Sequence, residues 1–244
     1  MVVLARYPTF AAPIKAITML DMAVMEESTK ISKDAISVAE TLLDIDSIQL
    51  KVSDPFTWVS GIESPIYCDN RRVNSYVEVR NKLVSCFVDL IREKFPQVEV
   101  IAGVATGGIP LGVLIADRME LPFIYARQAP KEHGLKRQVE GDYTDGQKVV
   151  LIEDHISTGG SSLIAINAIR AVNLNLLGLV SIMTYNFKAA KDQFAENNVN
   201  FYSLCDLETI LDVSIKRGSI TEEEKNSILE FKANPSTWGT NRKK

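Results

Sequence analysis

The sequence lacks the features that mark several large classes of protein. Its three cysteines, Cys68, Cys86 and Cys205, lie far apart and form no CxxC pair. A disulfide framework needs an even set of cysteines and a structural zinc site needs close pairs, so neither is predicted. We therefore expect a reducing, cytoplasmic setting.

Long hydrophobic runs and an excess of basic charge are also absent. No stretch approaches the roughly 18 apolar residues that a membrane-spanning helix needs, so we expect no membrane insertion. The 27 Lys and Arg residues face 31 Asp and Glu residues, which gives a formal net charge of −4. A dedicated nucleic-acid-binding protein normally has a basic face, so we expect no nucleic-acid partner.

What is present is the composition of a folded globular chain. The 244 residues are 46% hydrophobic and 24% charged, which are ordinary proportions for a folded protein. We expect a loosely ordered N-terminal extension over residues 1–28, followed by one domain over residues 29–244. Pro8, Pro13 and Lys15 interrupt the apolar stretch that a secretory signal would need. An organelle transit sequence and a start codon placed too early stay open as alternatives for the extension.

Apolar segments alternate with helical patterns along most of the chain. The spacing predicts strands at residues 98–105, 122–127, 148–154, 176–185 and 199–204, and helices at residues 32–43, 79–95, 110–119, 161–172 and 189–197. Strands that are apolar throughout are buried on both faces, and strands that alternate with helices form parallel sheets. The predicted fold class is α/β, a doubly wound parallel sheet with helices on both faces and a small N-terminal hood.

Two more helices are predicted at the C-terminal end of the chain. Asp206 is placed as the N-cap of the first and Gly218 as its terminator, while Thr221 and Glu224 have the spacing of a capping box that opens the second. Near the other end, residues 56–71 mix aromatic residues with glycine, proline and aspartate. That mixture is typical of an irregular or short-stranded surface feature.

The segment EDHISTGGSS, residues 153–162, suits a phosphorylated sugar. It follows an apolar strand and leads into a helix, whose unpaired N–H groups can bind phosphate, while Gly159 and Gly160 permit close backbone approach. Glu153 and Asp154 could accept hydrogen bonds from ribose hydroxyls and stabilise positive charge on the ring. The alternative is a glycine-rich turn capped by serines, but two acids at the end of a buried strand favour the functional interpretation. The GxxxxGK[ST] and GxGxxG nucleotide motifs are absent.

Two further loops have the character of anion sites. ATGGIPLG, residues 105–112, offers a backbone cradle suited to a second anionic group such as pyrophosphate, or else a tight packing turn. The long polar segment of residues 126–143 contains Arg127, Lys131 and His133, and we expect a basic lid that closes over a leaving group. The alternative for this segment is a solvated charged loop.

The first of these motifs resembles the phosphoribosyl pyrophosphate (PRPP) signature of type I phosphoribosyltransferases. With SGIESPIYCDNR, residues 60–71, and ARQAPKEHG, residues 126–134, the chain resembles the orotate phosphoribosyltransferase family in particular, from about residue 34 to residue 238. The resemblance implies a Mg²⁺-dependent glycosyltransferase on the type I phosphoribosyltransferase fold. It would convert orotate and PRPP into orotidine 5′-monophosphate and pyrophosphate, in pyrimidine nucleotide synthesis. A phosphoribosyltransferase for another base and a PRPP-sensing regulator are the alternatives.

The resemblance also implies a role for individual residues. PRPP would be bound by Thr106, Gly107, Arg127, Lys131, His133, Glu153, Asp154, His155, Ile156, Ser157, Thr158, Gly159, Gly160 and Ser161. Orotate would be bound by Phe56, Ser60, Tyr67 and Ser157. The catalytic residues would be Glu153, Asp154, Lys131 and His133. The two acids would act at the ribose, and Lys131 and His133 would act at the leaving pyrophosphate. Mg²⁺ would be carried by PRPP near Asp154 without a dedicated metal site. The lid would reach into a second subunit, which implies a homodimer.

Four positions depart from patterns common in that family. His155 stands where an apolar residue is usual, and Gln128 follows Arg127 where many members have lysine. Val59 precedes Ser60 where some members have lysine, and Tyr185 lies near the position of an arginine that contacts orotate in certain members. The departures concern individual contacts with orotate and pyrophosphate and leave the implied reaction unchanged.

Overall fold

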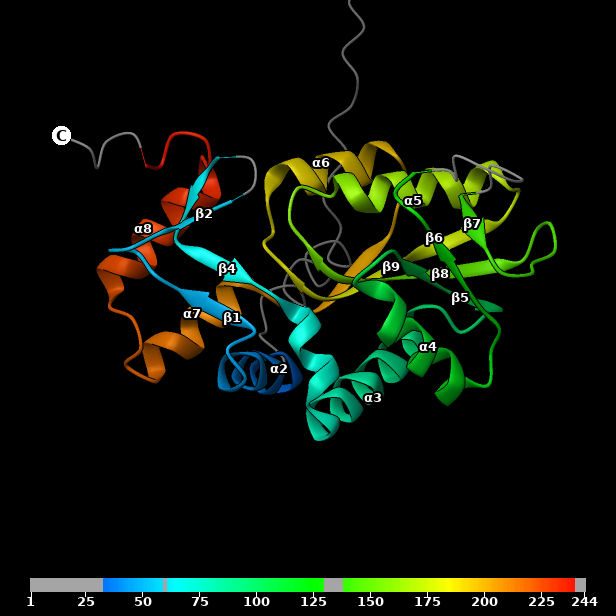
Figure 1. Ribbon diagram of the computed structural model, residues 1–244, viewed down its shortest axis with the longest axis horizontal. Coiled ribbons are helices and arrows are strands. Elements are labelled where there is room, and N and C mark those ends of the chain that lie inside the picture. Colours follow the sequence, from blue (N-terminus) through cyan, green and yellow to red (C-terminus); the bar gives the residue numbers. More distant parts are fainter. Residues whose placement is uncertain (1–32, 59–60, 130–137, 240–244) are drawn as a thin grey trace, which may run out of the picture. The chain divides into compact units, whose positions relative to one another are not determined.

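A computed structural model describes residues 33–58, 61–129 and 138–239. Its central sheet has the strand order β10-β9-β8-β5-β6-β7 (Figure 1). The strands are β5 (Val100–Val104), β6 (Phe123–Ala126), β7 (Val139–Glu140), β8 (Lys148–Ile156), β9 (Asn175–Thr184) and β10 (Phe201–Asp206). Neighbouring strands are parallel, except that β7 pairs antiparallel with β6. The predicted α/β fold with a central parallel sheet is confirmed.

Helices cover both faces of this sheet (Figure 1). One face carries α5 (Gly160–Ala171) and α6 (Lys188–Glu196), and the other carries α2 (Lys33–Asp44), α3 (Val77–Lys94), α4 (Gly108–Met119) and α7 (Leu207–Lys216). Side chains of β8 alternate between two apolar cores, with Val149 and Leu151 in one and Val150 and Ile152 in the other. Because both faces are buried here, residues 149–152 of this strand are apolar at every position.

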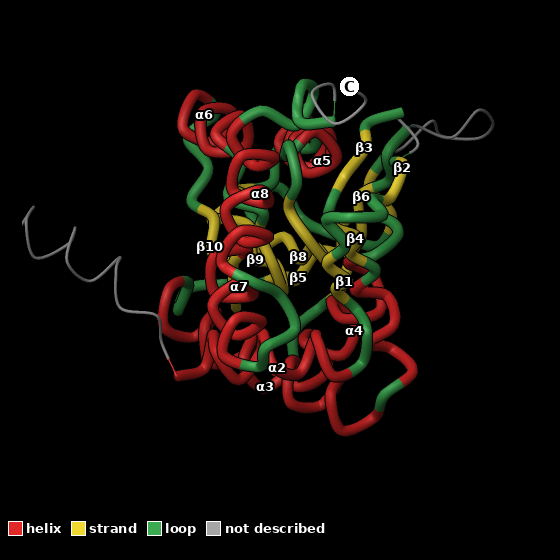
Figure 2. Tube along the Cα trace, turned by 90° about the vertical axis from the view of Figure 1, so that its left-hand side faces the viewer, coloured by secondary structure: helices red, strands yellow, loops and turns green. Residues whose placement is uncertain are grey.

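A group of smaller elements, here called the hood, lies beside the sheet. It consists of β1 (Ile48–Leu50), β2 (Phe56–Thr57), β3 (Glu63–Ser64), β4 (Ile66–Cys68), the 3-10 helix η1 (Asn70–Ser75) and α8 (Glu222–Ala233). β1 pairs antiparallel with β4, and β2 with β3. Both views show α7 and α8 beside these strands, although the two groups come from opposite ends of the chain (Figures 1 and 2). The Arg217–Asp44 ion pair, with 2.7 Å between Nη1 and Oδ1, joins the same two ends.

Most predicted helices and strands are confirmed, with bounds that differ by one or two residues. The predicted caps are present: the Asp206 side chain accepts a hydrogen bond from the Thr209 N–H at 2.9 Å, and Thr221 with Glu224 forms the capping box of α8. Within the described ranges, no helix is both long and apolar enough to cross a bilayer.

One boundary and two short strands differ from the prediction. The strand predicted at residues 148–154 continues to Ile156, which pairs with Thr184, so β8 also includes His155 and Ile156 of the signature segment. The segment of residues 126–143, expected to be a lid, contains β7, and β1 lies between residues 43 and 56, where no strand is predicted. Both missed strands are at most three residues long, which is too short to show a period in the sequence.

Candidate active site

The first two predicted loops meet at the carboxyl end of β8. A methyl group added at Gly107 would lie 2.5 Å from the Cγ atom of Asp154, and one added at Gly108 would lie 2.0 Å from the backbone oxygen of Ile152. Only glycine therefore fits where this loop passes β8. The peptide bond between Ala105 and Thr106, at the start of the same loop, is cis. The close contact places the predicted pyrophosphate loop directly against the predicted ribose-binding acids.

Both acids are buried and have opposite pKa shifts. Glu153 is 4% exposed and Asp154 is 8% exposed. The Ser162 hydroxyl donates to Glu153 Oε2 at 3.2 Å, but burial and the nearby charge of Asp154 raise the pKa of Glu153 well above its usual range. Burial would also raise the pKa of Asp154, yet hydrogen bonding and charge from His155 outweigh it and lower that pKa. The pair can therefore present one protonated and one ionised carboxyl group.

His155 contacts the Asp154 carboxylate from two sides. Its backbone N–H donates to Oδ1 at 3.0 Å, and its ring Nδ1 lies 3.3 Å from Oδ2. The ring is one-third exposed and lies edge-on to Tyr185, with 6.2 Å between the ring centroids. The residue that departs from the family pattern thus touches the acid at the centre of the site.

The signature loop forms a hollow beside the acids. The hollow has a volume of about 240 Å³ and is lined by residues 153–162. Gly159, the N-cap residue of α5, has φ +84°, and no side chain caps the first turn of this helix. An added methyl at Gly160 would meet nothing within 4 Å. Free N–H groups at the start of a helix, with open space above them, suit a phosphate group.

Cys68, at the end of β4 in the hood, and Tyr185, directly after β9, both lie within the electrostatic influence of Asp154. Burial, followed by the charge of Asp154, raises the pKa of the Cys68 thiol, and burial together with Cys68 and Asp154 raises the pKa of Tyr185. The Tyr185 ring is 2% exposed and lies edge-on to Trp58, with 6.2 Å between centroids. Tyr185 therefore forms part of the wall between the hood and Asp154.

The remaining predicted orotate contacts lie on β2 and β4. The rings of Phe56 and Tyr67 pack together with 5.3 Å between centroids, and Lys51 Nζ lies 5.2 Å from the centre of the Phe56 ring. Tyr67 is 40% exposed. Val59 and Ser60 lie outside the described residues.

The start of the predicted lid is held against the site. Gln128 Nε2 donates to the carbonyl oxygen of Ala105 at 3.2 Å, which ties the segment to the glycine loop. Arg127 Nη1 lies 3.8 Å from Glu140 Oε1 on β7. Lys131 and His133 lie outside the described residues.

Sequence reasoning gave no separate role to Asn70. It lies within residues 60–71, which carry part of the family resemblance, but its side chain is 1% exposed and bonds to Ser47 and to the backbone of Asp154. No local pattern could have indicated this contact, because its partners are 23 and 84 residues away.

Comparisons with known proteins agree with this geometry. The family model for the phosphoribosyl transferase domain matches residues 74–210. An orotate phosphoribosyltransferase of Lactococcus lactis subsp. cremoris is 46% identical over 202 residues, which cover 83% of this chain and 97% of the relative. The chain belongs to the orotate phosphoribosyltransferases.

Further members of the family support the assignment. The orotate phosphoribosyltransferase of Halalkalibacterium halodurans is 45% identical over 201 residues, covering 82% of this chain and 96% of that one. The crystal structure of the Aeropyrum pernix orotate phosphoribosyltransferase superposes with a TM-score of 0.63 at 25% identity and covers 74% of this chain and 99% of its own. The resemblance found in the sequence, the type I phosphoribosyltransferase fold and the class of pentosyltransferase are confirmed.

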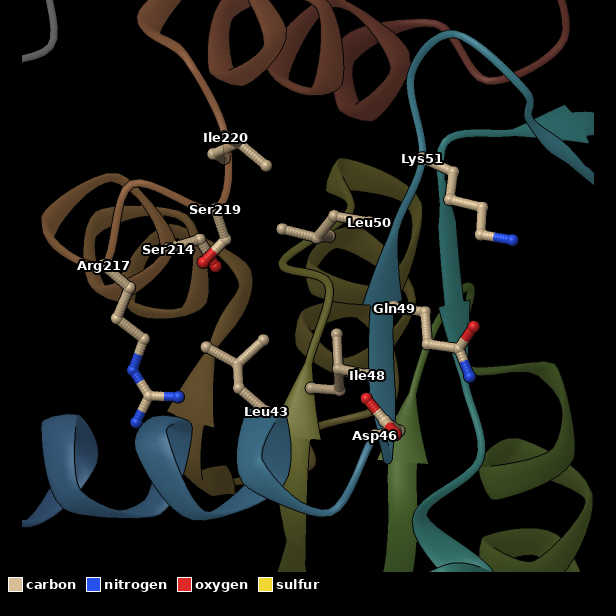
Figure 3. Close-up of a pocket in the computed structure, with 10 residues that line it drawn as sticks. All are labelled: Leu43, Asp46, Ile48, Gln49, Leu50, Lys51, Ser214, Arg217, Ser219 and Ile220. Carbon is tan, nitrogen blue, oxygen red and sulfur yellow. The ribbon is translucent and has the colours of Figure 1, made fainter.

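Two larger cavities lie outside the signature of this orotate phosphoribosyltransferase chain. A cavity of about 410 Å³ lies between β1 and the segment after α7, and Figure 3 shows Ile48, Leu50 and Ile220 pointing into it while Lys51 points away. A second, of about 880 Å³, lies between α6 and α8 and shares Thr158 with the signature loop. Neither contains the acids, so the hollow of residues 153–162 is the candidate active site.

Proposed function

We propose that the chain transfers the phosphoribosyl group of PRPP to orotate, releasing pyrophosphate and forming orotidine 5′-monophosphate for pyrimidine nucleotide synthesis. The observation that carries the proposal is the buried pair Glu153 and Asp154. The glycine loop lies against Asp154, and the uncapped start of α5 lies next to Glu153, where Ser162 donates to its carboxyl group. A sugar held on the acids has anion-binding backbone within reach at both ends.

The reaction replaces pyrophosphate at the anomeric carbon of the ribose. Orotate supplies the attacking nitrogen, so the protein contributes positioning and charge and no nucleophile. Asp154, which is ionised because its pKa is lowered, accepts hydrogen bonds from ribose hydroxyls and stabilises the positive charge that develops on the ring. Glu153, whose pKa is raised, can keep its proton and donate a hydrogen bond.

The two loops bind the phosphate groups of PRPP. The 5′-phosphate binds residues 157–161, where Ser157, Thr158 and Ser161 add hydroxyl donors to the start of α5, and His155 and Ile156 supply backbone beneath it. The pyrophosphate binds Thr106 and Gly107, with Arg127, Lys131 and His133 closing over it. These cationic side chains stabilise the charge of the leaving group.

Orotate binds on the hood side of the ribose. Ser157 reaches it from the signature loop, and Ser60 with the packed rings of Phe56 and Tyr67 borders the pocket. The attack on the anomeric carbon then comes from the side opposite the glycine loop, where the pyrophosphate leaves.

The donor set at the acids fits Mg²⁺. Glu153 and Asp154 offer oxygen ligands, which this ion prefers, and among the described residues no group of three His, Cys, Asp or Glu side chains could hold a metal by itself. A Mg²⁺ ion carried by PRPP near Asp154 would neutralise charge on the pyrophosphate.

The proposal includes a homodimer with a shared lid, in the cytoplasm. At the start of the lid segment, Gln128 bonds to Ala105 of the glycine loop and Arg127 lies 3.8 Å from Glu140 on β7. A lid that reaches across to a second subunit would complete two sites at once.

The direct test is the ultraviolet absorbance of orotate incubated with the protein, PRPP and Mg²⁺. We expect the orotate signal to fall only in the complete mixture, with pyrophosphate released in equal amount. Parallel reactions with uracil, hypoxanthine and adenine in place of orotate test for another base. Consumption of one of those bases without consumption of orotate would contradict the proposal, and PRPP binding without any turnover would indicate a sensor.

A further inference from the structure

A chain of buried hydrogen bonds joins the hood to the central acid. The Ser47 hydroxyl donates to Asn70 Oδ1 at 2.7 Å, and Asn70 Nδ2 donates to the backbone oxygen of Asp154 at 2.9 Å. Ser47 is 0% exposed and Asn70 is 1% exposed. The Asp154 carbonyl fixes the orientation of the amide, because it can only accept and therefore requires the Asn70 nitrogen, which leaves the Asn70 oxygen facing the Ser47 hydroxyl.

The bond to Asp154 lies where β8 loses one of its neighbours. β5 pairs with β8 only as far as Ile152, and beyond that residue β8 pairs with β9 alone. The Asp154 carbonyl accepts its hydrogen bond from the Asn70 side chain at this point. The Asn70 amide, which belongs to the hood, thus holds the Asp154 carbonyl of β8. This carbonyl lies two residues past Ile152, where the pairing with β5 ends.

On the hood side, the same residues continue the ribbon of β1 and β4. Ile48 pairs with Cys68, and the next residues outward, Ser47 and Asp69, are joined by a backbone hydrogen bond of 2.8 Å from Asp69 N to Ser47 O. Asn70 follows directly, at the start of η1. The ribbon that borders the proposed orotate pocket and the acid that faces the ribose are therefore connected through one side chain.

We propose that Asn70 is a positioning residue for the transfer reaction, which sets the placement of Asp154 relative to the hood and so of the ribose relative to the base. This inference rests on the proposed function. Asn70 touches no substrate in this account and acts through the Asp154 backbone. Reactions between two bound substrates are sensitive to such placement, and an error of about 1 Å can lower the rate about 100-fold.

The test compares Asn70→Ala and Asn70→Asp with Ser214→Ala. Asn70→Asp keeps the shape but replaces the nitrogen donor by an acceptor. Ser214 is an equally buried residue whose hydroxyl bonds to the Ile210 carbonyl at 2.8 Å in α7, away from the acids. Steady-state kinetics with orotate and PRPP give kcat and KM, PRPP titration without orotate gives the dissociation constant, and thermal unfolding gives the stability of each variant.

We expect kcat to fall at least tenfold in both Asn70 variants, while the dissociation constant for PRPP, which depends mainly on the two phosphate loops, changes less than about threefold. Ser214→Ala should lower the unfolding temperature and leave kcat unchanged. A kcat within twofold of wild type in the Asn70 variants, with a loss of stability like that of Ser214→Ala, would overturn the inference.

A second variant covers the case in which neither Asn70 protein folds. Ser47→Ala leaves the Asn70 donor in place and removes the buried hydrogen bond that holds the other end of its amide, so we expect kcat to fall about three- to tenfold. An unchanged kcat in that variant would also overturn the inference. The wild-type protein serves as the control: if it does not consume orotate, the proposed function fails and the inference fails with it, whereas active wild type with fully active variants contradicts the inference alone.

Discussion

Neighbouring carboxyl groups of one strand carry opposite pKa shifts in this site. Glu153 bonds to Ser162 and has its pKa raised by burial, whereas Asp154 bonds to His155 and has its pKa lowered despite burial. Groups whose environments separate their pKa values can serve as hydrogen-bond donor and anion at the same pH. The difference between the two residues comes from their partners and not from their own chemistry.

Stability should therefore depend on Glu153 in a defined pH window. A carboxyl group whose pKa is raised on folding binds more protons in the folded state, so the free energy of unfolding falls as pH rises from about 4.3 toward the raised value. We expect Glu153→Gln to raise the unfolding temperature at pH 8 by at least about 2 °C, which corresponds to about 1 kcal/mol for a chain of this size, and to change it little at pH 4.

Thermal unfolding of both proteins at the two pH values checks this prediction. An increase of the same size at pH 4 and pH 8 would contradict the proposed cause, since it would not depend on ionisation. Turnover of orotate by the variant should fall at the same time, because the donor to the ribose is altered.

The loss of activity at low pH should depend on His155. Hydrogen bonding and charge from this residue keep the pKa of Asp154 low, and burial alone would raise it. In His155→Leu we expect the acidic limb of the plot of kcat/KM against pH to move to higher pH, with activity at pH 8 within about threefold of wild type. An acidic limb at the wild-type position would show that His155 does not control this carboxylate.

Two glycines in the elements that border the site should respond in opposite ways to alanine. In Gly108→Ala the new methyl would strike the Ile152 carbonyl at 2.0 Å and push α4 away from β8. We expect it to destabilise the fold by about 1–3 kcal/mol. In Gly160→Ala the methyl meets open space, so stability should be retained, yet the methyl would occupy the proposed phosphate site.

Denaturant unfolding and PRPP titration of both variants separate these effects. Gly160→Ala should weaken PRPP binding about tenfold or more, which corresponds to about 1.4 kcal/mol. Wild-type affinity in Gly160→Ala would contradict the placement of the 5′-phosphate at the start of α5.

At the scale of elements, the sequence predicted what local periodicity encodes. The apolar run from Val149 to Ile152 predicted a strand buried on both faces, and its side chains do alternate between two cores. The spacing of Thr221 and Glu224 predicted the capping box that the structure shows. The extension of β8 by His155 and Ile156 was not predicted, because these residues follow two acids and precede a polar, glycine-rich loop, and they stay in the strand through pairing with β9. Polar residues that form a site at the end of a strand therefore hide the true end of that strand from a sequence-based prediction.

At the scale of the whole molecule, the sequence could identify the loops of the site but not the contacts between distant parts. The closeness of Gly107 and Asp154 follows from the rule that ligands bind at the carboxyl ends of parallel strands, where the loops after these strands meet. The bond from Asn70 to Asp154 follows from no such rule, because it depends on how the hood packs. Signature motifs therefore predict the residues that contact the substrate. They predict less well the residues that hold those contacting residues in position.

The proposed shared lid can be tested by mixing two inactive variants. Lys131→Ala removes a lid cation, and we expect kcat to fall about 100-fold; Asp154→Asn impairs the acid and should also reduce turnover strongly. If the lid acts on the partner subunit, a mixed dimer has one site with an intact lid and an intact acid. Random exchange would then restore about a quarter of wild-type activity.

Activity assays before and after subunit exchange, with each variant alone as the control, check this. If the lid acts on its own subunit, the mixed dimer contains no intact site and activity stays at the level of the separate variants. That result would contradict the shared lid and would leave the proposed reaction standing.

The aromatic contacts of the hood make the protein its own optical reporter. Its two tryptophans, Trp58 and Trp238, both lie edge-on to Phe231 with 5.7 Å between centroids, and Trp58 also lies edge-on to Tyr185 at the wall of the site. Light emitted by Trp58 should therefore change when a substrate reaches that wall, while Trp238 supplies a steadier background. Binding can be followed in real time without any attached dye, and a Trp58→Phe protein would identify which ring gives the signal.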